Sequence, residues 1–153
     1  MAAERNWQEE FDGRVAWIRG LVESAGVKGI VFGNSGGKDS ALVGILCKAA
    51  CENTVGIIMP CASKRNYGED ADDGRALAAQ YGIETRVVDL TEVRERELEA
   101  LKGVSELNDA AVTNIAPRLR MTTLYTIAAA EGRLVAGTGN RSEIYMGDRK
   151  SVV

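Results

Sequence analysis

A short stretch, SGGKDS at residues 35–40, combines the residue types that bind phosphate groups. It follows the apolar run KGIVFGN and leads into SALVGILCKAAC, so it is expected to connect a strand to the start of a helix. The N–H groups and the dipole of a helix N-terminus attract anions. Gly36 and Gly37 would let the backbone approach the anion closely, and Lys38 would add a positive charge. The stretch therefore predicts a phosphate-binding turn; the alternative is an ordinary glycine turn with a solvated lysine.

The same stretch departs at two positions from the common phosphate loop G-x-x-x-x-G-K-[ST]. Phe32 stands where the first glycine of that loop should be, and Asp39 follows Lys38 where a Ser or Thr is expected. A carboxylate at this point indicates phosphate chemistry of another kind. The chain also has no histidine, which excludes His-based acid–base catalysis and His-ligated metals.

The composition is that of one ordinary globular domain. The chain has 153 residues and a formal net charge of −3, which disfavours a broad nucleic-acid surface but leaves room for a local basic patch. No apolar run approaches the roughly 20 residues of a membrane span, and the first residues lack the apolar core of a signal peptide. Scattered cysteines indicate reduced thiols and a cytoplasmic location. We expect Cys47, Cys51 and Cys61 to be buried as small apolar residues, because they are too few for a metal site.

Four apolar runs predict strands, and segments with helical spacing separate them. The strands are KGIVFGN, TVGIIMP, ETRVVDL and RLVAGTGN. A helix precedes the first strand, with Gly26 as its stop and with Trp7 and Trp17 anchored in the core. Thr91 is expected to cap the helix TEVRERELEALKG, and residues 106–132 are expected to be mostly helical. Strands that alternate with helices predict an α/β fold, in which a parallel sheet carries helices on both faces.

The order of these elements predicts the strand order 3-2-1-4. Right-handed crossovers let the first three strands step outward in one direction, and the longer link of two helices lets the fourth strand return beside the first. The switch point of such a sheet lies between strands one and four, and ligands bind there at the carboxyl ends of the strands. The two segments at those ends are GNSGGKDS and GTGNRSE, which we therefore expect to meet in one crevice.

The motif S-G-G-x-D-S resembles the pyrophosphate-binding loop of the N-type ATP pyrophosphatases. That superfamily splits ATP between the α and β phosphates, and its fold is the adenine-nucleotide α-hydrolase-like, or Rossmann-like, sheet. The resemblance implies that Lys38 and Asp39 are catalytic, with Asp39 on the magnesium ion of the leaving pyrophosphate. Asn34 stands where the family's strand delivers an apolar residue, so the end of the first strand is expected to be less well packed. The residues implied to bind ATP in this loop are Gly33, Asn34, Ser35, Gly36, Gly37, Lys38, Asp39 and Ser40.

A second segment, NIAPRLRMTTLYTIAAAEGRLVAGTGNRSEIYMG, resembles the corresponding region of the ammonia-dependent NAD synthetases. The shared features are Asn114 to Met121 at a helix start, and then Gly137, Thr138 and Glu143 after a strand. The resemblance runs from about Gly29 to Gly147 and covers most of the chain. It implies that Thr138 contacts ATP and that Glu143 is the second magnesium ligand; the alternative for Glu143 is a surface carboxylate in a loop.

Two arginines, Arg118 and Arg120, are the candidates for substrate binding. By the resemblance, Arg118 binds deamido-NAD. Two residues apart on a helix, the side chains point about 200° apart around the axis, so they serve different groups unless the helix begins after them. A pair of solvated arginines is the alternative, and for Arg120 both interpretations stay open.

The resemblance implies ATP-dependent amidation of deamido-NAD to NAD with free ammonia, through an adenylated intermediate and with release of AMP and pyrophosphate. The family is dimeric, which implies a homodimer of the full-length enzyme, without a nucleic-acid or membrane partner. One rival is another enzyme of the superfamily, such as a tRNA-modifying enzyme, although no RNA-binding extension or paired catalytic cysteines are evident. The other rival is a nucleotide-binding chain without turnover. Pyrophosphate release that depends on deamido-NAD would distinguish the three.

The last six residues, DRKSVV at 148–153, resemble nothing in the family. The match ends at Gly147, where the family continues through further strands with more ATP- and substrate-binding residues. We therefore expect residues 1–147 to form an incomplete synthetase domain, followed by a non-native tail. We expect this chain alone to bind ATP weakly and to make little or no NAD. A shorter natural homologue with its own C-terminus is the alternative.

Overall fold

The computed structural model describes residues 6–61, 69–139, 142 and 145, and within them a parallel sheet of four strands forms the centre of the fold. The order β3-β2-β1-β4 confirms the predicted order. In the central strand, Val31 pairs with Val55 on one side and with Val135 on the other. The strands are β1 (Gly29–Gly33), β2 (Thr54–Ile58), β3 (Glu84–Val87) and β4 (Arg133–Ala136).

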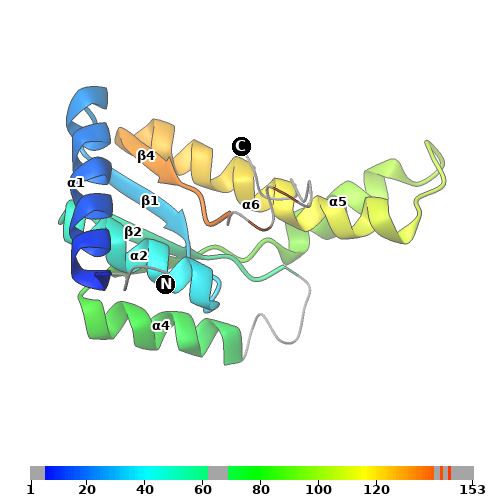
Figure 1. The fold of residues 1–153 in the computed structure, drawn as a ribbon. Helices are drawn as coiled ribbons and strands as arrows, with labels where there is room; N and C mark the ends of the chain where they lie inside the picture. Colours follow the sequence, from blue (N-terminus) through cyan, green and yellow to red (C-terminus); the bar gives the residue numbers. More distant parts are fainter. Residues whose placement is uncertain (1–5, 62–68, 140–141, 143–144, 146–153) are drawn as a thin grey trace.

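Helices cover both faces of the sheet (Figure 1). One face carries α2 (Lys38–Ala50) and α4 (Glu69–Tyr81), with α1 (Trp7–Ala25) packed on α2. The other face carries α6 (Asp109–Glu131), with α5 (Thr91–Leu101) against it. Right-handed crossovers explain this division, because the chain steps outward from β1 to β3 and then returns past β1 to β4. Among the helices of the described residues, none combines the length and the apolar character that crossing a membrane requires.

Successive residues of β1 point to opposite faces of the sheet and contribute to two different apolar cores. Phe32 packs with Ala78 and Ile83 on the side of α4. Val31 packs with Ile57 on the side of α6. Both faces of the strand are apolar because helices exclude water from both, as in other parallel sheets.

The two longest helices end where the sequence provides glycine. Gly26 (φ 63°) follows α1 and Gly132 (φ 64°) follows α6, and both adopt the left-handed conformation that glycine reaches without strain. The α6 helix starts after Asn108, whose side chain accepts a hydrogen bond from the Ala111 N–H at 2.9 Å. The predicted stop of the first helix is therefore confirmed.

Two predictions about helices are wrong. Thr91 does not cap α5: it is the first helical residue, and the Asp89 carboxylate accepts the hydrogen bond of its N–H at 2.9 Å. Trp7 and Trp17 are not core anchors, since they are 71% and 66% exposed. The helix α1 packs on α2 through an apolar stripe around Val15, and the tryptophans lie outside that stripe.

Candidate functional site

The turn between β1 and α2 is held by the sheet at one end and by the helix at the other. The first residue of the turn, Asn34, still donates its backbone N–H to the Ile57 carbonyl at 2.8 Å. Gly36 has a φ of 76°, in the left-handed region that favours glycine, and its glycine identity is therefore required by the turn. Gly37 is the N-cap of α2, which begins at Lys38. The predicted strand–turn–helix arrangement is confirmed.

Two serine hydroxyls close the turn from within. Ser40 is 2% exposed, and its hydroxyl donates to the Gly37 carbonyl at 2.9 Å. The hydroxyl oxygens of Ser35 and Ser40 lie 3.0 Å apart, and the Ser35 hydroxyl is left to donate because the Ser40 proton is already used. The first turn of α2 thereby fixes the start of the loop.

Three consecutive N–H groups of the turn make long hydrogen bonds to side-chain oxygens. The Ser35 N–H donates to the Ser40 hydroxyl at 3.3 Å. The Gly36 N–H donates to the Asn34 Oδ1 at 3.4 Å, and the Gly37 N–H donates to the Ser35 hydroxyl at 3.4 Å. Typical N–H···O hydrogen bonds measure about 2.9–3.0 Å, so these three are weak. A charged phosphate oxygen would bind the same donors more strongly and can replace the internal acceptors.

Lys38 and Asp39 bring opposite charges to the start of α2. Lys38 is exposed, and Asp39 is half-buried in the first helical turn. Within the described part of the chain, no group of three potential metal-ligating side chains occurs. A single carboxylate beside a phosphate site fits Mg²⁺, because proteins usually hold this ion through one or two carboxylates together with substrate phosphates. The second predicted metal ligand, Glu143, lies outside the described residues.

The end of β4 lies beside the turn. Phe32 of β1 pairs with Ala136 of β4 in parallel register, so the two chains leave the sheet at the same edge as neighbours. Gly33 follows on β1, and the half-buried Thr138 follows shortly after β4. The predicted switch point between the first and fourth strands is therefore confirmed. The structure brings Thr138 and the turn to one edge of the sheet.

The helix α6 carries Arg118 and Arg120 on different sides. Arg118 is exposed, and its guanidinium donates to the Asn114 carbonyl of its own helix at 3.1 Å. Arg120 is half-buried, and its Nε donates to the Met59 carbonyl at 3.1 Å, just beyond β2. Arg118 thus stays at the surface, whereas Arg120 connects α6 to the carboxyl end of β2. The two side chains do not converge on one group, in agreement with the helical geometry.

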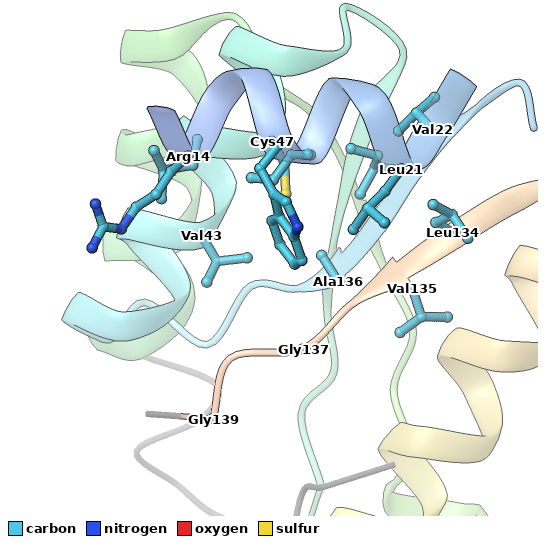
Figure 2. A pocket seen from close by; sticks show the side chains of 14 residues that line it. Arg14, Leu21, Val22, Val43, Cys47, Leu134, Val135, Ala136, Gly137 and Gly139 are labelled. Atoms are coloured by element: carbon cyan, nitrogen blue, oxygen red, sulfur yellow. The ribbon is translucent and has the colours of Figure 1, made fainter. Parts of the chain in front are cut away.

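An apolar cavity of about 490 Å³ lies between α1, α2 and β4 (Figure 2). Gly137 and Gly139 line one end of it, whereas no residue of the turn at 35–40 does. Figure 2 shows the Arg14 guanidinium pointing away from the apolar side chains. The cavity therefore borders the segment after β4 without including the turn at residues 35–40. Its apolar lining includes Trp17, Leu21, Val43, Cys47, Leu134 and Ala136.

The cysteines pack as apolar side chains. Cys47 and Cys61 are buried as predicted, and Cys51 is half-buried. Burial, with a smaller contribution from Cys51, raises the pKa of the Cys47 thiol to about 12. Burial also raises the pKa of the Cys61 thiol, against the opposing charge of Arg120. A protonated thiol is a poor nucleophile and a poor metal ligand, so these two cysteines do not offer cysteine-based catalysis.

A contact between Asn34 and Gly74 is the part of the site that sequence reasoning missed. The Asn34 side chain is buried, with 2% exposure, and its Nδ2 donates to the Gly74 carbonyl of α4 at 2.9 Å. The end of β1 is therefore closely packed, and the expectation of a looser end is wrong. Gly74 itself is the signal in the sequence, because a glycine inside a helical pattern lowers helix stability and is therefore a candidate for a packing role.

A parallel α/β sheet with a glycine-rich turn at its switch point defines a protein of the Rossmann-like fold class, in which that point is the usual ligand site. The family model described as NAD synthase matches residues 10–148. The chain therefore belongs to the NAD synthase family.

Relatives of known name agree with this membership. The chain is 43% identical over 145 residues to the NH(3)-dependent NAD(+) synthetase of Carboxydothermus hydrogenoformans, a match that covers 93% of this chain and 58% of that protein. The structure is similar to that of the NH3-dependent NAD synthetase of Campylobacter jejuni in complex with the nitrate ion (TM-score 0.83, 31% identity, 94% of this chain and 61% of that one). It is also similar to that of NMN synthetase from Francisella tularensis (TM-score 0.86, 28% identity, 95% of this chain and 59% of that one). The chain thus spans little more than half the length of these relatives.

Proposed function

We propose that this chain acts in the ATP-dependent amidation of deamido-NAD to NAD, with ammonia as the nitrogen donor. The observation that carries the proposal is the turn at residues 35–40, where weakly bonded N–H groups stand beside a lysine and a carboxylate at the start of α2. Relatives that are named NH(3)-dependent NAD(+) synthetase support the choice of substrates.

The proposed reaction has two steps. In the first, a carboxylate oxygen of the nicotinate group attacks the α-phosphorus of ATP, the bond from that phosphorus to the bridging oxygen breaks, and pyrophosphate leaves. In the second, ammonia attacks the acyl carbon of the adenylate, AMP leaves with the former carboxylate oxygen, and the nitrogen loses a proton. Neither step needs a nucleophile from the protein, so the lack of histidine is no obstacle.

The turn would hold the pyrophosphate end of ATP. The N–H groups of residues 35–37 and the Lys38 ammonium would stabilise the negative charge that grows on the leaving pyrophosphate, because fixed donors act most strongly where charge develops. Asp39 would hold Mg²⁺, with Glu143 as the second carboxylate. When bound, the ion neutralises part of the phosphate charge.

The segment after β4 and the helix α6 would supply further contacts to ATP and to deamido-NAD. Thr138, after β4, would contact ATP, and the exposed Arg118 would bind a charged group of deamido-NAD. Arg120 already bonds the Met59 carbonyl, so its contribution to substrate binding would come from a site next to the end of β2.

The mononucleotide counterpart of deamido-NAD is the second candidate substrate. Its support is the similarity to NMN synthetase from Francisella tularensis, which matches this chain with a TM-score of 0.86. The two substrates share the nicotinate carboxylate, so the chemistry of the turn would be unchanged. They differ in the adenylate half of the dinucleotide, which only one of them presents to the protein.

A chimeric enzyme tests the proposed function. The segment of the Carboxydothermus hydrogenoformans relative that matches this chain is replaced by the residues of this chain, so that the relative supplies the remainder of its length. Pyrophosphate, AMP and NAD are then measured with ATP, Mg²⁺, ammonia and either deamido-NAD, nicotinate mononucleotide, tRNA or no acceptor.

We expect pyrophosphate and NAD in equal amounts, with deamido-NAD as the required acceptor. Replacement of Asp39 by Asn in the same chimera should remove most of the activity. A folded chimera that binds Mg-ATP but releases pyrophosphate equally well without deamido-NAD, or with tRNA in its place, would contradict the proposal.

A further inference from the structure

The side chain of Asn34 is directed into the protein. Its exposure is 2%, its Nδ2 donates to the Gly74 carbonyl at 2.9 Å, and its Oδ1 accepts the Gly36 N–H at 3.4 Å. Its backbone N–H is engaged as well, with the Ile57 carbonyl at 2.8 Å. One N–H of the Asn34 amide and its backbone N–H are therefore used inside the protein.

The space around Asn34 is shaped by two glycines. A Cβ at Gly74 would lie 3.1–3.2 Å from the amide atoms of Asn34. A Cβ at Gly56 would lie 3.3 Å from the Asn34 Cβ and 3.1 Å from the ring of Phe32. The amide of Asn34 can reach the backbone of α4 because Gly74 has no side chain. The contact joins two segments that are distant in the sequence, the phosphate-binding turn and the middle of α4.

We propose that Asn34 is a positioning residue of the phosphate-binding turn, anchored on the Gly74 carbonyl of α4. The anchor fixes the direction of Oδ1, and Oδ1 in turn holds the Gly36 N–H until an anion replaces it. Within the turn, Gly36 is the residue that lies in the left-handed region, with a φ of 76°, so the orientation of its peptide group decides where its N–H points. The proposal rests on the proposed function only in taking pyrophosphate as the ligand of the turn.

The test measures the affinity for Mg-pyrophosphate by calorimetry and the stability by urea unfolding, both with the chain of residues 1–153. Asn34→Leu removes both side-chain hydrogen bonds and replaces the amide by an apolar group of similar size. Urea unfolding then shows whether the variant stays folded after the Gly74 carbonyl has lost this partner. Thr54→Val is the matched control, because Thr54 is also 2% exposed and its hydroxyl donates to the Cys51 carbonyl at 2.7 Å. This bond lies at the amino end of β2, away from the turn at residues 35–40.

We expect Asn34→Leu to weaken pyrophosphate binding about fivefold to tenfold, the effect of one hydrogen bond. Thr54→Val should also lower stability, because a buried hydrogen bond is lost, and should leave the affinity unchanged. Unchanged affinity in Asn34→Leu, or an equal loss in Thr54→Val, would overturn the inference.

Gly74→Ala separates positioning from a general structural role. The new methyl group presses on the Asn34 amide, so affinity should fall by about twofold to fivefold, although alanine favours a helix more than glycine does. In the Asn34→Ala background the methyl group has no amide to displace, and Gly74→Ala should cause no further loss of affinity. Additive losses in the double variant would contradict the anchor. A wild-type chain that binds no pyrophosphate would instead contradict pyrophosphate as the ligand of the turn, and this inference with it, whereas the chimeric enzyme tests the proposed function separately.

Discussion

Asp39 is the carboxylate that the sequence places directly after the lysine of the turn, and its charge should matter through a metal ion. We predict that Asp39→Asn weakens the binding of Mg-ATP at least about tenfold, as expected for a residue at a metal site. The binding of metal-free ATP should change much less, because the carboxylate makes no favourable contact with bare phosphates. Calorimetry with and without Mg²⁺ measures both affinities.

The matched control for this change is Asp109→Asn. Asp109 is also an acidic residue in the first turn of a helix, but in α6, so its replacement changes the same kind of charge at another position. It should leave both affinities unchanged. Equal effects of Asp39→Asn on Mg-ATP and on metal-free ATP would remove Asp39 from the metal site.

Arg118 should serve the dinucleotide and not ATP. A charge-assisted hydrogen bond contributes roughly 1.5–3 kcal/mol, so Arg118→Ala should weaken deamido-NAD binding about tenfold to a hundredfold. Arg96→Ala is the control, since Arg96 is another exposed arginine, on α5, and its ion pair with Glu92 is long, at 3.8 Å. Binding of both ligands is measured in the chimeric enzyme. A similar loss of ATP affinity in Arg118→Ala would show that the assigned role is wrong.

At the residue scale, the sequence predicts chemistry where local geometry is sufficient. The positive φ of Gly36 and the start of α2 at Lys38 follow from a glycine pair between a strand and a helix. The role of Asn34 could not be predicted, because its partner Gly74 lies in a helix that only the tertiary fold brings close. The direct ligand roles assigned to the loop residues and to Thr138 stay predictions.

Among the elements, α6 is joined to two strands through one carboxylate. Glu131 at the end of α6 accepts hydrogen bonds from Arg86 of β3 and, at 2.6 Å, from the Nε of Arg133 of β4. The bonds from Arg86 and Arg133 lower the pKa of Glu131 below its ordinary value. Because the pKa is lower in the folded state, the carboxylate stabilises the fold above the unfolded pKa, and this contribution is lost as pH falls below about 4.

We predict that Glu131→Gln lowers the free energy of unfolding at pH 7 by a few tenths to about 1 kcal/mol, as for other partly exposed ion pairs. The difference from the wild-type chain should shrink as pH falls from about 5 to 3, since the wild-type carboxylate then becomes protonated. Urea unfolding at several pH values measures it. Glu92→Gln, which removes a long pair with Arg96, is the control and should follow the wild-type curve. A difference that stays constant with pH would exclude this role for Glu131.

Element boundaries are predictable where a residue determines the end by itself. Gly26 ends α1 because a left-handed residue is needed there. The wrong assignments concern residues whose environment depends on packing between elements. Trp7 continues the helical spacing of Phe11 and Val15, yet the stripe that packs on α2 starts at Phe11 and leaves Trp7 exposed.

For the whole molecule, the apolar cavity between α1, α2 and β4 should bind a hydrophobic dye. Its volume of about 490 Å³ is in the range of pockets that hold small ligands. Trp17 lines the cavity, whereas Trp7 is 71% exposed at the start of α1 and does not. We predict that Trp17→Gln reduces the fluorescence of a bound anilinonaphthalene dye several-fold and that Trp7→Gln does not. Equal reductions in both variants would show that the dye binds elsewhere.

The strand order of the molecule is the global feature that the sequence predicts best. Four apolar runs and right-handed crossovers leave few arrangements, and the longer link before β4 selects the order β3-β2-β1-β4. The position of the cavity was not predictable, because it depends on how α1 packs against α2 and β4. The same limit applies to the contact between the turn and α4.

We expect the turn after β1 and the segment after β4 to form one ATP site. A titration of the ¹⁵N-labelled chain of residues 1–153 with Mg-ATP, followed by amide NMR shifts, tests it most directly, because the method detects even weak binding. We predict that the largest shifts occur at the amides of residues 35–40 and of Thr138, with little change along α5. Shifts confined to the cavity residues of α1, or no shift at residues 35–40 at saturating Mg-ATP, would contradict this shared ATP site.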